Sequence, residues 1–560
     1  MVPEARGALR GAAATARIVR MVETPGAGET ADPAAAPVVA PAGGGRRLAR
    51  ATAIFSLATG LSRVLGLVRE IVAKNAFGVQ GPVNAFQIAF LLPNTVRALV
   101  ADAALSSAFV PVFSDLLERG ERRRAWRVAS SLLWLTLLGL GALTALFMVV
   151  APWVMRPLYP HDHDLLVGLS RVLFPIVALL GVSGIVVGIL NTYDEFSIPA
   201  LSPVAWNLAI VAGLAIGVPQ ADTTDGKLYV YAAAILVGTV IQVLLPLPWL
   251  RGRGGRLELV LDWRDPYVRR VFRLMLPVTL GLGLINVNAL IDGVIAARLV
   301  DANIAPAAID AAFRIYMLPQ GMFSVAVATV LFPSLARFAA RGDAAGFRDT
   351  VSLGLRQIAF LLVPASVVTA VLAEPITRLV YQRGAFEPAQ TPVVAGALAA
   401  FAAGLTFNGA MLMLNRAFFS LQSNWIPTLV ALGDLVLNGV LDVVLSPVGT
   451  WGIPLATSIV NVAGTAALLV LLRRRTGRVG FAAISSSFLR VAAASALAGA
   501  AAFAVWWPLD DAAGRALGGQ LASVLPALAA AAVVYTAACR ALEVREMQAL
   551  LSLRGRLRRG

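Results

Sequence analysis

Arginine side chains stand inside two long apolar runs near the start of the chain. Arg63 and Arg69 lie in the first run, with Glu70 beside them, and Arg97 lies in the second. An arginine at the centre of a bilayer costs about 2.5–3.5 kcal/mol even on the most lenient insertion scale, so it needs a partner or a wet cavity. Guanidinium groups that share one cavity would bind an anion, most naturally a phosphate, which arginine grips through two parallel hydrogen bonds.

A second interpretation of these arginines is structural. An arginine near a helix end extends its side chain to the lipid headgroups and needs no ligand. Arg63 lies about 18 Å past the start of its apolar run near Ala51, by the rise of an α-helix, which is a long reach. Arg314 lies early in a later run, so the structural interpretation is stronger there. Pro319 and Gly321 interrupt that same run, as in helices that line a cavity.

A second polar set lies in the C-terminal half of the chain. Asp292 stands in one apolar run, Asn438 and Asp442 stand in another, and Thr457 follows in the next. Asn438 and Asp442 are four residues apart and therefore share a helix face, and Asp434 precedes them by another four. Carboxylate, amide and hydroxyl oxygens suit a small, hard cation. A structural role explains the aspartates as well as a cation site does, because spacing alone also allows them to pair with an arginine or to cap a helix.

The sequence contains no enzyme signature. His161 and His163 are the only histidines and share the loop HDHD, where two ligands make an incomplete metal site, so we expect a solvated loop. Cys539 is the only cysteine, which excludes an intramolecular disulfide. There is no Walker loop and no HExxH, and the glycine run at 43–45 lies in low-complexity sequence. We expect neither catalysis nor an organic cofactor.

The composition is that of a protein embedded in a lipid bilayer. The chain has 560 residues, of which 58% are hydrophobic and 14% charged, and its mean hydropathy is +0.77. Soluble domains do not have that balance. The net charge of +16 does not indicate nucleic acid as a partner, because the basic residues alternate with apolar spans.

The hydropathy pattern predicts an all-α polytopic membrane protein with about fourteen transmembrane helices. Two of these helices fill the opening stretch from about 51 to 113. Every second connection is rich in arginine, which places both termini in the cytoplasm. The other predicted spans are 128–150, 165–190, 200–218, 228–250, 274–299, 307–335, 351–372, 393–419, 426–445, 453–472, 488–506 and 520–538.

We divide the chain into five parts. The Ala/Pro/Gly-rich composition of the first part predicts disorder, and Met21 is an alternative start. Each half opens with a span that bears polar residues, which hints at an internal repeat like those of secondary transporters. The parts are a tail at 1–45, an N-terminal lobe with helices 1–6 at 46–250, a C-terminal lobe with helices 7–12 at 251–475, helices 13–14 at 476–540, and a basic cytoplasmic tail at 541–560.

Several sequence blocks resemble a known family. LSRVLGLVRE at 61–70 and LLPNTVRALVADAALSSAFVPVF at 91–113 are similar to the start of the MurJ (MviN) lipid II flippases, which belong to the multidrug/oligosaccharidyl-lipid/polysaccharide exporter superfamily. The likeness runs from about Arg47 to Arg475. Further blocks are GILNTYDEFSIPALSPVAWNLAI at 188–210, LPQGMFSVAVATVLFPSL at 318–335, YQRGAFEP at 381–388 and NRAFFSLQSNWIPT at 415–428.

The resemblance implies a fold, a substrate and a set of site residues. Two lobes would surround a central cationic cavity, and the last two helices would form a groove on the lipid side. The substrate would be lipid II, an undecaprenyl-pyrophosphate-linked disaccharide-pentapeptide. It would move by alternating access from the inner to the outer leaflet of the bacterial plasma membrane for peptidoglycan synthesis, with the cell-wall synthesis machinery as a partner.

The family's motifs fall on particular positions of this chain. The implied substrate-binding residues are Arg63, Arg69, Arg97 and Arg314, to which we add Asn94 and Asp102. The implied sodium site is Asp292, Asn438, Asp442 and Thr457.

The chain also departs from the family's pattern. Asn84 stands where many members carry Asp, Asp102 where Glu is usual, and Ala103 where Gly is usual. Phe313 replaces an acidic residue next to Arg314. Asn84 and Phe313 carry no charge and Asp102 is shorter than Glu, so these departures disfavour a charge-paired gate that uses the family's acids.

Other functions are weighed against this one. The nearest is a flippase for another polyprenyl-pyrophosphate-linked glycan. A cation-coupled drug exporter handles cations, which cavity arginines disfavour. A membrane enzyme acting on polyprenyl phosphates would need clustered acids or histidines, and a scaffold without transport would have no reason to bury arginines.

Overall fold

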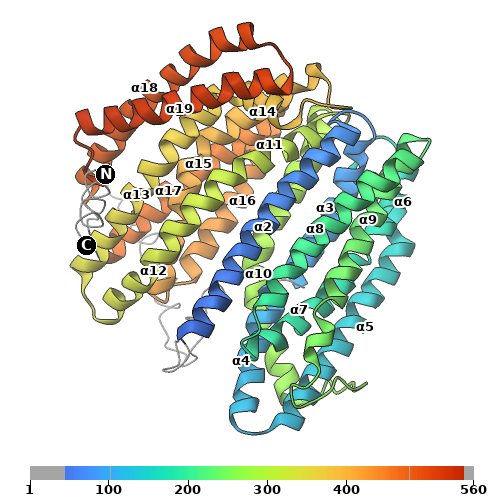
Figure 1. Cartoon of the computed structure of the whole chain (residues 1–560). Helices are drawn as coiled ribbons and strands as arrows, with labels where there is room; N and C mark the ends of the chain where they lie inside the picture. The colour runs from blue at the N-terminus through green and yellow to red at the C-terminus, as the bar shows by residue number, and fades with distance from the viewer. Residues whose placement is uncertain (1–44, 101–102, 478–479, 548–560) are drawn as a thin grey trace, which may run out of the picture. The chain divides into compact units, whose positions relative to one another are not determined.

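The computed structural model describes residues 45–100, 103–477 and 480–547 (Figure 1). These residues form α-helices joined by short turns, 3-10 segments and π-helical segments, with no strand among them. The all-α prediction is therefore confirmed for the part of the chain that is described. The predicted N-terminal tail, apart from residue 45, and most of the predicted basic C-terminal tail lie outside the described residues.

Eleven helical segments are long and apolar enough to cross a membrane. They coincide with eleven of the predicted spans. The other three predicted spans fall on α2 (Gly45–Phe77), on α3 (Val83–Val100) with α4 (Ala103–Glu118), and on α10 (Pro266–Ile295). The described residues of these helices do not meet the same criteria of length and hydropathy, so the total of fourteen spans is not confirmed. The eleven segments are Arg122–Leu158, His163–Thr192, Ser197–Gln220, Thr224–Leu250, Ala305–Ala340, Ala344–Val371, Pro388–Ser420, Trp425–Val448, Gly452–Thr476, Ile484–Ala513 and Leu517–Ala541.

The helices of the first half of the chain pack mainly on one another. Helix α2 packs along α8, α8 along α9, and α4 and α5 along α7. The first helix of the second half, α10, is exceptional because it packs on α3 and α4 (Figure 1). The bounds of the remaining helices here are α5 (Arg122–Met155), α6 (His163–Leu173), α7 (Ile176–Thr192), α8 (Ser197–Gly217) and α9 (Thr224–Leu244).

The helices of the second half gather around α15. Helices α11, α13 and α17 pack on it, and α16 packs on α17 and α10. A five-residue π-helical turn, η5 (Gln320–Ser324), joins α11 to α12, which confirms the predicted irregularity at Pro319 and Gly321. The bounds are α11 (Ala305–Pro319), α12 (Val325–Ala340), α13 (Ala344–Val371), α14 (Ala373–Tyr381), α15 (Thr391–Ser420), α16 (Trp425–Leu445) and α17 (Gly452–Thr476).

The last two helices, α18 (Phe481–Ala513) and α19 (Leu517–Ala541), lie side by side and α18 packs along α13 (Figure 1). Two ion pairs among the described residues attach them to the second half. Arg378 on α14 donates through Nη1 to both oxygens of Asp510, at 2.9 and 2.7 Å. Arg356 on α13 lies 3.4 Å from Glu546, just after α19. Because both arginines are mostly buried, these ion pairs fix α18 and α19 against the second half.

The turn between α2 and α3 is clasped by segments from the second half. Gly78 and Gly81 both have positive φ, which glycine adopts at no steric cost. The Val79 amide donates to Oε1 of Gln390 at 2.9 Å, and the Gly81 amide donates to the Asn303 carbonyl at 2.8 Å. The tight glycine turn is thus held on two sides by parts of the chain more than 200 residues away.

Asn84 completes this clasp from the first turn of α3. Its side chain is fully buried, and Nδ2 donates to the carbonyls of Val79, Gly81 and Asn303, at 3.1, 3.0 and 2.5 Å. Oδ1 accepts from the Ala307 amide at 2.9 Å. An aspartate cannot donate to those carbonyls, which gives a physical reason for the amide at this position.

Tyr159 makes a similar tie after α5. Its hydroxyl donates to the Ala302 carbonyl at 2.9 Å. Burial, with the carboxylates of Asp162 and Asp301 nearby, raises the pKa of Tyr159 to about 12, so the hydroxyl remains a donor at physiological pH.

We predict that Asn84→Asp loosens the clasp. The substitution removes the donor to three carbonyls and turns a carboxylate toward them, and each unsatisfied buried group costs about 1–3 kcal/mol. The thermal unfolding midpoint of the purified protein should fall, and amide hydrogen exchange should speed up at Val79 and Gly81. The matched control is Asn424→Asp, at an exposed helix start without a side-chain cap. Equal protection of the turn in both variants would contradict the assignment.

Candidate functional site

Glu70 is the carboxylate on which two of the predicted arginines meet. It is buried on α2, and its Oε1 lies 2.5 Å from Nη2 of Arg69 and 3.7 Å from Nε of Arg314 on α11. The Arg69 guanidinium also lies over the Trp206 ring of α8, 4.7 Å from its centroid, which adds a cation–π contact. Arg69 and Arg314, which the sequence predicts to share one site, therefore lie close together because both contact the Glu70 carboxylate.

Asp310 is a second carboxylate in the same place. Its Oδ1 accepts from Nη2 of Arg314 at 3.0 Å, and its Oδ2 lies 3.8 Å from Nζ of Lys74. Gln87 on α3 donates to Oδ2 at 3.4 Å. Lys74 is almost completely buried and also donates to the Ala307 carbonyl at 3.4 Å. Asp310 therefore connects α2, α3 and α11.

These five residues form what we call the charged cluster: Arg69, Glu70, Lys74, Asp310 and Arg314. Three cations and two carboxylates leave one positive charge in excess. The cluster joins the first and second halves of the chain through ion pairs, in addition to their apolar packing. The structural interpretation, in which arginines extend to the headgroups, does not describe Arg69 or Arg314, because carboxylates on α2 and α11 hold their guanidinium groups between helices.

The other predicted substrate-binding residues lie outside this cluster. Arg63 is exposed, and its Nη1 would lie 3.0 Å from a Cβ added at Gly321 in η5, so α2 approaches the second half there as well. Arg97 donates through Nε and Nη2 to Oδ1 of Asn94, at 3.1 and 2.9 Å, which joins two predicted residues. Asp102 falls outside the described residues.

Sequence reasoning missed Asp310, Lys74 and Gln87. Phe313, which replaces the expected acid, packs against Tyr316 and Phe401, with ring centroids 5.7 and 5.6 Å apart. Charge pairing nevertheless occurs through Asp310, one helical turn before Arg314. Asp310 could have been predicted from its spacing of four residues from Arg314, which places the acid and the arginine on one helix face.

Three of the four residues predicted to bind a cation meet between α10 and α16. Asn438 donates through Nδ2 to Asp292 at 2.7 Å and to Asp442 at 2.9 Å. Asn438 and Asp442 are fully buried. Asn288 also donates to Asp292, at 3.1 Å. Thr457 donates to the Ile453 carbonyl of its own helix at 3.4 Å and makes no hydrogen bond to the other three among the described residues.

Two oxygens of this set are buried without a hydrogen-bond partner among the described residues, namely Oδ1 of Asn438 and Oδ1 of Asp442. Buried acceptors are rarely left without a donor, and two carboxylates close to one amide are compensated either by a bound cation or by a shared proton. The donor set of carboxylate and amide oxygens therefore fits a small cation.

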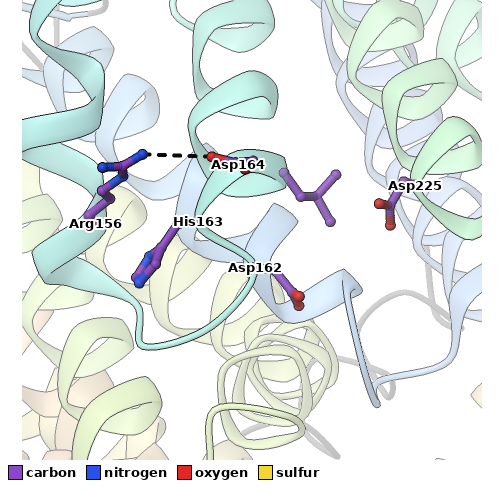
Figure 2. A pocket seen from close by; sticks show the side chains of 6 residues that line it. Arg156, Asp162, His163, Asp164 and Asp225 are labelled. Carbon is purple, nitrogen blue, oxygen red and sulfur yellow. Dashed lines mark ion pairs between the residues drawn. The ribbon is translucent and has the colours of Figure 1, made fainter.

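The loop with the histidines borders a cavity of about 730 Å³ (Figure 2). Arg156 lies 3.7 Å from Asp164, and Asp225 lies across the cavity on α9 (Figure 2). His163 lines the cavity, whereas His161 is not among its lining residues. No three His, Cys, Asp or Glu side chains gather as metal ligands anywhere in the described residues. The expectation of a solvated loop stays a prediction.

Comparison with known proteins places these features in a family. The family described as "Lipid II flippase MurJ" matches residues 73–508. The chain belongs to the lipid II flippase MurJ family. The match covers α3 to α18 almost entirely and therefore includes Asp310, Arg314 and the cation set.

Relatives in the MurJ family are moderately similar over most of the chain. "Lipid II flippase MurJ" of Burkholderia cenocepacia is 29% identical over 440 residues, which cover 76% of this chain and 84% of that protein. "Probable lipid II flippase MurJ" of Haemophilus influenzae is 30% identical over 421 residues, which cover 71% and 81%. A family of flippases is a family of transporters, so a membrane enzyme is not favoured.

Solved structures agree on the fold. "Lipid II flippase MurJ, inward closed conformation" superposes with a TM-score of 0.71 at 23% identity and covers 87% of this chain and 99% of that one. An inward-facing multidrug resistance MATE family transporter of the MOP superfamily superposes with a TM-score of 0.65 at 17% identity, covering 75% and 95%. Both likenesses support the predicted MurJ fold class.

We predict that Asp310 and Lys74 are energetically coupled. Asp310→Asn removes charged hydrogen bonds worth about 1.5–3 kcal/mol and should lower the unfolding midpoint of the purified protein. Lys74→Met should do the same. The double variant should lose less than the sum, with a coupling of about 0.5–3 kcal/mol, since neither charge is then left without its partner.

The control is the exposed pair of Arg119 and Asp115, 2.9 Å apart at the end of α4. Asp115→Asn should change stability little, because solvent screens exposed ion pairs. Strict additivity of the Lys74 and Asp310 substitutions would show that the pair does not interact.

Proposed function

We propose that this protein is a flippase that moves lipid II from the inner to the outer leaflet of the plasma membrane by alternating access. Membership of the MurJ family supports the activity. The charged cluster supports a way of binding the pyrophosphate, because it holds one positive charge in excess between the two halves of the chain.

Arg69 and Arg314 exchange partners when the substrate binds. Both guanidinium groups are engaged by carboxylates, Glu70 and Asp310. Phosphate oxygens compete for the same donors, and they match the planar arginine fork. The bound pyrophosphate then takes over the arginines and frees Glu70 and Asp310 from ion pairs that tie α2 to α11. Substrate binding thereby weakens the joint between the two halves.

The exchange leads to opening at the clasp around the α2–α3 turn. The arginine-rich connections support a cytoplasmic position for both termini, which puts this turn on the outer side. The clasp closes that side through hydrogen bonds of Asn84 and Gly81. Once the charged cluster loosens, the hydrogen bonds of the clasp still hold the halves together on this side. When they also open, the head group is released outward while the prenyl tail stays in lipid. Contact with the cell-wall synthesis machinery at this side is part of the proposal.

We predict that Lys cannot replace Arg at the binding positions. Lys keeps the charge but lacks the planar fork, so Arg63→Lys, Arg69→Lys and Arg97→Lys should reach the membrane normally but support flipping poorly. Arg→Ala should be worse, by about ten- to a hundredfold in binding, because a charged contact is lost. The measurement is complementation of a conditional flippase mutant, with membrane levels checked by immunoblot.

Arg119→Lys at an exposed turn is the control for these substitutions and should complement fully. Full activity of all three Lys variants would leave a basic cavity without an arginine clamp. Failure of the wild-type protein to complement, together with lipid II that still accumulates on the cytoplasmic side, would overturn the flippase itself.

We also propose that Asp292, Asn438 and Asp442 hold sodium, with Thr457 as a fourth ligand. The unpartnered oxygens of Asn438 and Asp442 support this, since a bound cation would satisfy both. The ion would neutralise one carboxylate and draw α10 and α16 together. The same proposal includes sodium as an ion whose binding is coupled to transport.

Sodium should therefore stabilise the purified protein, because a ligand that binds only the folded state raises its stability by mass action. We expect a higher unfolding midpoint in sodium chloride than in choline chloride at equal concentration. Asp442→Ala should abolish the difference. An equal effect of both salts on the wild-type protein would leave no reason to place sodium here.

A further inference from the structure

Three successive turns of α16 each bury an oxygen that has no hydrogen-bond partner within the described part of the chain. The atoms are Oδ2 of Asp434, Oδ1 of Asn438 and Oδ1 of Asp442. The residues are four apart, so they follow one face of the helix at intervals of slightly more than one turn, or about 6 Å. Buried acceptors without donors are uncommon, and three in a row require one common explanation.

Asp434 is the member of this row that the proposed sodium site does not use. Its carboxylate lies against α17, where a Cβ added at Gly464 would be only 2.4 Å from Oδ2. The missing side chain at Gly464 is therefore what makes room for the carboxylate. Asp434 as a whole is only partly buried by protein, so other side chains do not enclose its carboxylate completely.

We propose that Asp434 is a relay position for the monovalent cation of the neighbouring site. This inference rests on the proposed function, in which Asp292, Asn438 and Asp442 bind sodium. The ion passes along α16 from Asn438 to Asp434, one helical turn nearer to the end that begins at Trp425. Each position on the way offers an oxygen to which no donor of the described residues is bonded.

The charge distribution suggests the direction in which the relay leads. Arg473, Arg474 and Arg475 lie in the last turn of α17, and Arg475 donates to Ser423 in the turn before α16. Clustered arginines mark the cytoplasmic side of membrane proteins. Asp434 therefore lies on the cytoplasmic side of the sodium site.

The ligand chemistry at Asp434 favours brief occupation by a singly charged ion. Calcium takes six to eight oxygens, and magnesium needs near-octahedral coordination with several waters. Asp434 contributes one carboxylate, which attracts a monovalent ion without holding it tightly. Such a position lowers the barrier for arrival and for departure alike, so it changes the exchange rate of the ion and leaves its affinity unchanged.

The test measures binding and exchange of ²²Na⁺ on the purified full-length protein, with choline balancing the ionic strength. Asp434→Asn keeps the side-chain shape and removes the charge. We expect exchange into unlabelled sodium to slow by about tenfold, which corresponds to about 1.4 kcal/mol of barrier, while the dissociation constant stays within about threefold of wild type. Gly464→Ala should slow exchange as well, because its methyl group displaces the carboxylate.

Thr465→Val is the matched control. Thr465 follows Gly464 on α17. Its hydroxyl donates to the Phe407 carbonyl of α15 and not to Asp434 of α16. This variant should exchange sodium like the wild type. Thermal unfolding of each variant confirms that it is folded.

The outcomes separate the relay from the functions on which it rests. Wild-type exchange in folded Asp434→Asn or Gly464→Ala overturns the relay and leaves the sodium site standing. A large loss of affinity in Asp434→Asn makes Asp434 a ligand of the site itself and equally overturns the relay. No sodium binding by the wild type, or binding that survives Asp442→Ala, removes the sodium site, whereas complementation decides the flippase activity independently.

Discussion

Charge compensation inside an apolar medium governs how the two halves of this protein meet. Arg69, Lys74 and Arg314 stand where bare cations would be costly, and the cost is met by Glu70 on the same helix as Arg69 and by Asp310 on α11. Removing one carboxylate would leave cations without partners, so the cluster acts as a unit. Because its members come from α2 and α11, the joint between the halves depends on charges that an anionic ligand can also satisfy.

The clasp around the α2–α3 turn works on a different principle. Its groups are carbonyls and amides, and one neutral side chain, Asn84, serves as donor and acceptor at once. Neutral hydrogen bonds are less sensitive to a nearby anion than ion pairs are, because their charges are only partial. Under the proposed mechanism, a joint built from both kinds loses its ionic part to the substrate first and its neutral part when the halves separate, which divides alternating access into two consecutive steps.

The two polar centres have opposite charge. The charged cluster has an excess of cations, and the set of Asp292, Asn438 and Asp442 has two carboxylates with unpartnered oxygens nearby. Under the proposals made here the first attracts the pyrophosphate and the second attracts sodium. Both lie between helices of different segments, the first between α2 and α11 and the second between α10 and α16, so occupation of either changes how helices pack.

The all-helical membrane fold follows from the sequence alone, because continuous apolar runs of helix length need every backbone group satisfied within the segment in lipid. Position in the sequence also marks Arg69, Arg314, Asp292, Asn438 and Asp442 as costly polar groups in apolar runs, but it leaves open whether they reach the headgroups, cap a helix or find a partner. The folded arrangement of the helices answers that question and identifies the partners. Glu70 meets Arg314 across more than 200 residues, and Asn438 meets Asp292 across 146. Helical spacing predicts which residues share a face within one helix, but it carries no information on which face of another helix lies opposite, and that is set by packing of the whole chain.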